Sequence, residues 1–258
     1  MKTMRRLPTR SASTALALAC LLLALVGLPL APQALAQTPA TAAVSPIAAG
    51  VAALERGHYA IAMRAFRAEA TKGNALAASN IGYLYERGLG VPQNYAEAMA
   101  WYRKAAAQGL AQAQFNIGTL YFQGWGVERN PRESFAWFRR AALQNLPEAQ
   151  YMVGLAYLEG HGTSPQAALA LDWLIKAARQ GYPAAQMMAA QVLLSGDAGK
   201  EEPAKAYVWA DVAAQAGQTD ASLVRDYASY RLSARELEQA RSASQACQNS
   251  GFQACPAP

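Results

Sequence analysis

A tryptophan recurs every 36 residues through the middle of this chain, and this spacing constrains the fold more than any other feature. The tryptophans are Trp101, Trp137, Trp173 and Trp209. Other positions keep the same step without a gap: Gly82, Gly118 and Gly154, followed by Ala190, and the alanine pairs that begin at Ala105, Ala141, Ala177 and Ala213. A period of this length indicates an array in which each unit is one structural motif.

Each unit is predicted to contain two helices. In the second unit, Ile117, Gly118 and Tyr121 share one face of a first helix, and Gly118 lets a neighbouring helix come close. The segment Gly124–Val127 follows, and its glycines can take the positive φ values of a tight connection. The periodicity of the residues after Asn130 then predicts a second helix.

Several helix ends carry recognisable signals. Asn130 and Pro131 are predicted to cap and open a second helix, and Glu133 to complete a capping box. Pro165, with Ser164 as its cap, and Pro203 are predicted to open the later second helices. Asn145 stands where the other units have Gly109, Gly181 and Gly217, and Asn is the next best residue for a left-handed helix end.

The regular units are predicted to have different segments on either side. Residues 77–221 form four repeats, and residues 47–76 form a degenerate N-terminal capping helix pair, because terminal repeats are often atypical. Residues 222–258 are expected to form C-terminal capping helices and a tail, with a capping box from Ser233 to Glu236. Residues 37–46 are rich in Ala, Thr and Pro and are expected to be a disordered linker.

The first 36 residues have the three-part pattern of a Sec-type signal peptide. A basic leader precedes an apolar run from Ala15 to Leu30, and cleavage is expected after Ala36. The protein is therefore expected in the periplasm or outside the cell, with no membrane span after cleavage. The whole chain has a net charge of +6, but without the leader 19 basic residues face 17 acidic ones. This balance does not favour nucleic-acid binding.

Two cysteines lie close together at the C-terminus, Cys247 and Cys255. In an exported protein such a pair favours a disulfide bond. Free thiols and a redox pair are the alternatives, although the spacing is not Cys-x-x-Cys.

The repeat carries residues that resemble the Sel-one-like repeat (SLR) family, a relative of the tetratricopeptide repeats. The matching pattern is Ile81-Gly82-x-x-Tyr85-x-x-Gly88-x-Gly90-Val91, followed by Ala98-x-x-Trp101-Tyr102-x-Lys104-Ala105-Ala106-x-x-Gly109 and Ala113-Gln114. The resemblance implies an all-α fold, a right-handed α-solenoid with a concave face for protein partners. It also implies a scaffold or adaptor role in a cell-envelope or signalling assembly.

If the helix pairs stack as in tetratricopeptide repeats, the first helices line the concave face. In the second and third units these helices are apolar on both faces, so one face can form a groove for a helix or an extended peptide. The same face also carries Glu86, Leu158 and Leu194. The predicted partner-binding residues are Ser79, Tyr83, Phe115, Thr119, Phe122, Tyr151, Leu155, Met187 and Gln191.

The sequence offers little for catalysis. Its histidines are His58 and His161, and it has no zinc, nucleophile-elbow, phosphate-loop or dinucleotide motif. We therefore expect a monomeric protein scaffold with no cofactor, no metal and no enzymatic activity. An envelope module that contacts glycan or peptidoglycan is the alternative. A β-lactamase-like hydrolase ranks third, since that activity is ascribed to cysteine-rich members whose repeat cysteines this chain lacks.

Overall fold

The computed structural model describes residues 45–258, which form twelve α-helices and no strand. The predicted signal peptide, its cleavage site and most of the predicted linker lie outside the described residues. The helices are α1 (Pro46–Glu55), α2 (Tyr59–Ala70), α3 (Ala75–Arg87), α4 (Tyr95–Ala106), α5 (Ala111–Gln123), α6 (Pro131–Ala142), α7 (Pro147–Glu159), α8 (Ala167–Ala178), α9 (Pro183–Ser195), α10 (Pro203–Gln215), α11 (Ala221–Tyr230) and α12 (Ala234–Asn249).

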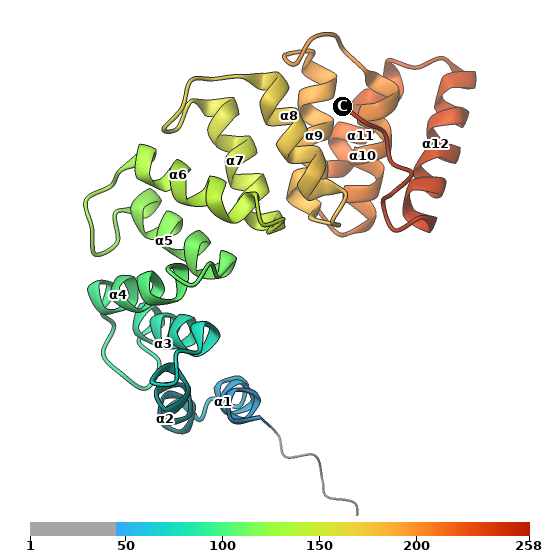
Figure 1. Ribbon diagram of the computed structural model, residues 1–258. Helices are drawn as coiled ribbons and strands as arrows, with labels where there is room; N and C mark the ends of the chain where they lie inside the picture. The colour runs from blue at the N-terminus through green and yellow to red at the C-terminus, as the bar shows by residue number, and fades with distance from the viewer. Residues whose placement is uncertain (1–44) are drawn as a thin grey trace, which may run out of the picture. The chain divides into compact units, whose positions relative to one another are not determined.

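The helices pack as consecutive pairs, each pair lying against the next, as Figure 1 shows. Four pairs correspond to the 36-residue units: α3–α4, α5–α6, α7–α8 and α9–α10. The pair α1–α2 precedes them, and α10 also packs against both α11 and α12. The described residues therefore form an α-solenoid, as predicted.

In the first three units a glycine of the first helix faces a large side chain of the second helix. A Cβ atom on Gly82 would lie 2.7 Å from the ring of Tyr102, and one on Gly118 would lie 2.7 Å from the ring of Phe138. Gly154 faces Leu174 in the same way. The prediction that these glycines allow close helix packing is confirmed, since any side chain would displace the partner.

The fourth unit fills the same place differently. Ala190 replaces the glycine, and Ala210 stands where the earlier units have Tyr102, Phe138 and Leu174. Both alanines are fully buried in one apolar cluster. The smaller partner on α10 therefore leaves room for the Cβ atom that α9 carries.

Most of the predicted helix ends are confirmed. Gly124 and Asn145 have φ values of 75° and 63°, in the left-handed region. The side chain of Asn130 accepts a hydrogen bond of 3.1 Å from the backbone N–H of Glu133, and Pro131 opens α6. The capping box between Ser233 and Glu236 is present. The box predicted with Glu133 is only half formed, because the backbone N–H of Asn130 donates to the carbonyl oxygen of Tyr121.

The prediction that Pro165 opens a second helix is wrong. Helix α8 begins at Ala167, with Gln166 in the cap position. The backbone N–H of Gln166 donates to the carbonyl oxygen of Tyr157 at 2.8 Å, and Asn130 donates to Tyr121 at the matching place in the preceding unit. This bond sets where the second helix starts. Pro165 lies before that start, in the loop, where its ring packs against Gly160.

In two units a buried glutamine of the first helix accepts a hydrogen bond from a glutamine that follows the second helix of the same unit. The amide nitrogen of Gln144 donates to the Oε1 atom of Gln114 at 2.8 Å, and Gln180 donates to Gln150 at the same distance. The next acceptor, Oε1 of Gln186, is buried without a partner among the described residues. The donor position for Gln186 is occupied by Ala216, whose side chain has no amide.

We expect the substitution Ala216→Gln to stabilise the protein by about 1 kcal/mol, because it supplies the missing donor to a buried acceptor. The midpoint of urea unfolding, followed by circular dichroism, measures this gain. The reverse change, Gln180→Ala, should lower the midpoint by leaving Gln150 Oε1 unpaired. An unchanged midpoint for Ala216→Gln would contradict the expected hydrogen bond between a glutamine at position 216 and Gln186.

The C-terminal tail closes over the last units. Cys247 and Cys255 are paired and buried, with their Cα atoms 4.5 Å apart. The ring of Phe252, between them, approaches Gly181 at the end of α8. The pair therefore stabilises a tail that covers the junction between the third and fourth units, and its oxidised state in the cell stays a prediction.

Candidate functional site

The predicted partner-binding residues lie in different places. Ser79, Tyr83, Phe115 and Thr119 line a hollow of about 760 Å³, which we call the α3–α5 groove. Phe122 and Leu155 line a smaller cavity, and Gln191 lies in a hollow near α11. The residues Tyr151 and Met187 line none of these hollows.

The α3–α5 groove is formed by side chains of the first helices of two units, together with the end of α1. Tyr83 is 37% exposed, whereas Ser79 is buried in its floor. The ring of Phe115 packs against Phe138, with 5.3 Å between centroids. The ring edge away from Phe138 therefore lines the groove. Thr119 donates its hydroxyl to the carbonyl oxygen of Phe115.

Two side-chain hydrogen bonds lie among the residues that line the α3–α5 groove. The Tyr102 hydroxyl donates to Oε2 of Glu86 at 2.8 Å, and the amide of Gln112 donates to Oδ1 of Asn116 at 3.1 Å. Burial and the charge of Glu86 raise the pKa of the Tyr102 hydroxyl far above its ordinary value. The proton therefore stays on Tyr102, and this hydroxyl holds the Glu86 carboxylate in place.

Other groove residues were not predicted. Asn80 and Asn116 line the groove at matching positions of two units, whereas the later units have Met152 and Met188 there. Nδ2 of Asn80 is buried without a hydrogen-bond partner among the described residues. Trp125 is 39% exposed at the rim and stacks on Tyr95. The matching positions of Asn80 and Asn116 could have been found from the repeat. The exposure of Trp125 could not, because the spacing of residues does not give the exposure of a loop side chain.

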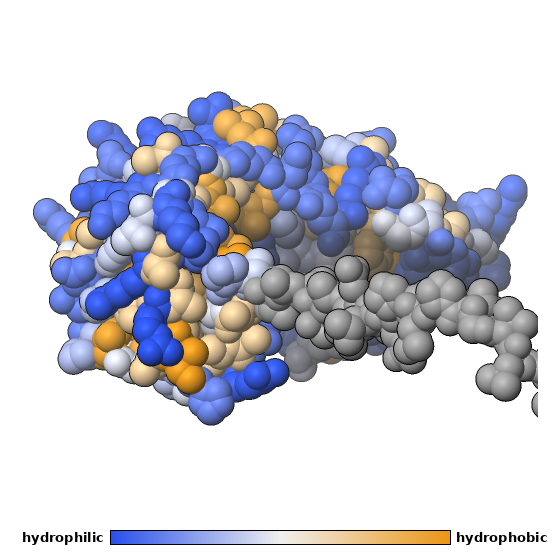
Figure 2. All heavy atoms as spheres, turned by 60° about the horizontal axis from the view of Figure 1, so that its bottom comes forward, coloured by the Kyte–Doolittle hydropathy of each residue, from blue (hydrophilic) through white to orange (hydrophobic). Residues whose placement is uncertain are grey.

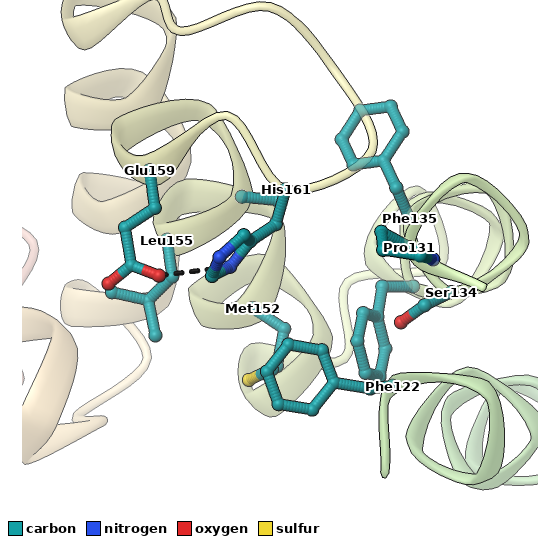
Figure 3. Close-up of a pocket in the computed structure, with 10 residues that line it drawn as sticks. Phe122, Pro131, Ser134, Phe135, Met152, Leu155, Glu159 and His161 are labelled. Carbon is teal, nitrogen blue, oxygen red and sulfur yellow. Dashed lines mark ion pairs between the residues drawn. The ribbon is translucent and has the colours of Figure 1, made fainter. Parts of the chain in front are cut away.

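The cavity that contains Phe122 and Leu155 is much smaller, about 30 Å³, and lies between α6 and α7 (Figure 3). His161 lines it, with Nδ1 3.0 Å from a Glu159 carboxylate oxygen and its ring edge-on to Phe122. His161 is therefore only partly exposed. A space of this size holds about one water molecule and no peptide.

The remaining predicted residues lie farther along the solenoid. Tyr151 packs its ring on Tyr182, with centroids 5.2 Å apart, and burial raises the pKa of its hydroxyl. Met187 is partly buried on α9. Gln191 is exposed and faces α11, where Leu223 and Tyr227 are exposed as well. The predicted residues thus form no continuous apolar strip.

The second helices of the first three units carry a tryptophan that lies beneath a cation three residues later. The Lys104 ammonium lies 3.8 Å from the Trp101 ring centroid, and Arg140 and Lys176 lie over Trp137 and Trp173. The basic pairs that begin at Arg103 and Arg139 are exposed, as expected of a solvated face. In the face that Figure 2 shows, hydrophobic residues lie in patches between hydrophilic ones.

Two further features bear on chemistry within residues 45–258. No helix in this part of the chain combines the length and hydropathy needed to cross a bilayer. The same part contains no group of three or more His, Cys, Asp or Glu side chains placed to bind a metal ion.

Stacked helix pairs with a groove along their first helices define the class of α-solenoid repeat proteins. Within this class the chain belongs to the Sel1 repeat family, which matches residues 75–110, 111–146, 147–182 and 183–218. Sel1 repeats generally mediate protein–protein interactions, and these families are generally non-catalytic scaffolds. The matched segments cover the four helix pairs from α3–α4 to α9–α10.

Two solved structures are similar to this chain. A protective antigen of uropathogenic Escherichia coli strains that displays an SLR fold is 30% identical, with a TM-score of 0.72, and the match covers 83% of this chain and 48% of the antigen. This chain therefore spans about half of that relative. A Sel1 repeat protein from Oxalobacter formigenes is 32% identical, with a TM-score of 0.65, over 74% of this chain and 83% of its own. A search of curated proteins finds no match.

Proposed function

We propose that this protein is an exported scaffold that binds an extended segment of a protein partner in the α3–α5 groove. The carrying observation is the groove itself, a hollow of about 760 Å³ that brings together predicted residues from two units. Pockets of this size are typical of specific ligand sites. The N-terminal signal pattern supports an exported location.

The composition of the groove fits a peptide. Half-exposed rings, Tyr83 and Trp125, supply the large contact areas that anchor partners at low entropic cost. Amides at Asn80 and Asn116 can both donate to and accept from a peptide backbone. The unpaired Nδ2 of Asn80 would gain an acceptor if a peptide carbonyl entered the groove.

Site-specific photo-crosslinking tests this function. A photoreactive phenylalanine analogue in place of Tyr83 is expected to crosslink one partner in native cells, and mass spectrometry of the product should place the crosslink in an extended segment. The matched control is the same analogue at Leu143, which is 62% exposed at the end of α6 and lines no hollow described here. Equal crosslinking of the same partner from both positions, or none from Tyr83, would contradict the proposal.

A glycan in the same groove is the second candidate. Exposed aromatic rings beside amides are also suited to sugars, because the rings stack on sugar faces while the amides bond hydroxyls. A Tyr83 crosslink to cell-wall glycan instead of a polypeptide would favour this candidate.

A further inference from the structure

One carboxylate stands apart in the α3–α5 groove. Glu86 comes from α3, and its side chain is only 15% exposed. Its Oε2 atom accepts from the buried Tyr102 hydroxyl, which positions the carboxylate but carries no charge to balance it. A carboxylate removed from water is costly unless a cation faces it.

The cation nearest to Glu86 is Arg87, which lines the groove at an exposed position. The Nε atom of Arg87 lies 3.9 Å from Oε1 of Glu86, at the outer limit for an ion pair, and no other described cation comes within that limit. The Arg87 side chain is 62% exposed, and its guanidinium lies over the Tyr83 ring at 5.7 Å. Glu55 adds a second carboxylate to the groove lining. Two carboxylates against one rim guanidinium leave the groove short of positive charge.

Aromatic side chains complete the surroundings. Tyr83, Phe115 and Trp125 line the same groove as Glu86. A cation that lies over aromatic rings and beside a carboxylate is stabilised by both. A long side chain that ends in a positive charge can make both interactions, and lysine and arginine have such side chains.

From this arrangement we propose that the α3–α5 groove takes a lysine or arginine side chain of an extended partner peptide, with Glu86 as its counter-charge. The inference rests on the function proposed above and adds the chemistry of the partner. The repeat places this preference at one position, because the residues that match Glu86 in later units are Phe122, Leu158 and Leu194. The solenoid is therefore expected to select a basic side chain of its partner only at the unit that contains Glu86.

The test uses the isotope-labelled chain from Gln37 and two short peptides that differ at one residue. The first is acetyl-Gly-Ala-Lys-Ala-Gly-amide, and the second has norleucine, which has no charge, in place of lysine. NMR titration should show the Trp125 indole and the Tyr83 amide shifting with the lysine peptide. The norleucine peptide should bind more weakly by roughly tenfold, the scale of one lost charge pair.

Two variants examine the charges separately. Glu86→Gln keeps an acceptor for Tyr102 and should abolish the preference for lysine over norleucine. Arg87→Ala removes the competing guanidinium and should strengthen binding of the lysine peptide. Glu128→Gln is the matched control, since Glu128 is exposed on the α5–α6 loop and should change neither affinity.

The outcomes separate the two proposals. If both peptides bind equally, the groove binds peptides but the inference about a basic side chain is wrong. If neither peptide shifts the groove signals, both proposals are wrong, and an N-acetylglucosamine oligomer that shifts them would indicate a glycan site instead. An Arg87→Ala variant that weakens lysine-peptide binding would also overturn the role given to Glu86.

Discussion

Replacing Gly162 with alanine is expected to lower the free energy of unfolding by ~3 kcal/mol or more. A Cβ atom there would lie 2.1 Å from the carbonyl oxygen of Pro131, in the first turn of α6. The neighbour is backbone, so it cannot move aside as a flexible side chain would. Gly162 also has a φ of 76°, which penalises any residue with a Cβ atom.

Gly109→Ala separates the two costs. Gly109 has a similar φ of 86°, but a Cβ atom there would meet nothing within 4 Å. This variant should therefore show only the backbone cost, about 1–2 kcal/mol. Urea unfolding of both variants by circular dichroism gives the comparison. If Gly162→Ala were no worse than Gly109→Ala, the close contact between the α7–α8 loop and α6 would not exist in solution.

The second large effect is expected at Trp209, where Trp209→Ala should cost about 4 kcal/mol. Its side chain is completely buried. Helix α10, which carries it, packs against α9, α11 and α12, so truncation leaves a cavity with helices on several sides. Little of that cavity can close, because the neighbouring helices are held by other contacts.

Trp101→Ala is the matched comparison, because Trp101 occupies the same position of the repeat. Trp101 is only partly buried, and the Lys104 ammonium covers part of its ring. We expect this variant to lose about 1–2 kcal/mol, the burial and cation–π contributions of a partly exposed ring. Thermal unfolding of the two variants measures the difference, and equal losses would show that α11 and α12 do not shield Trp209.

Helix order and helix packing could be predicted because they depend on residues that repeat. Gly118 and Asn145 each report a local backbone or packing requirement that any unit must meet. The start of α8 could not be predicted from proline, since Gln166, which precedes it, is held by a backbone bond to Tyr157 of the preceding helix. Residues such as proline indicate a helix start from local sequence only. Such a local prediction fails where a contact with the preceding helix fixes a different start.

The groove was predicted only in part. Assigning a helix face places Tyr83 and Thr119 correctly beside the α3–α5 groove. It does not show that Phe115 turns toward Phe138, or that Tyr102 reaches the groove from the second helix. These features depend on rotamers and on the distance between helices, which a period of 36 residues does not contain.

The pairing of a small residue on each first helix with its partner on the second helix has a consequence for recombination. Gly82 faces Tyr102, whereas Ala190 belongs with Ala210. A crossover that combines one helix of the first unit with one helix of the fourth would join a glycine to an alanine, leaving a void, or an alanine to a tyrosine, creating a clash. A crossover in the connection after a second helix keeps each pair intact. Exchange between the first and fourth units is therefore expected to preserve this packing when whole units move and to disrupt it when single helices move.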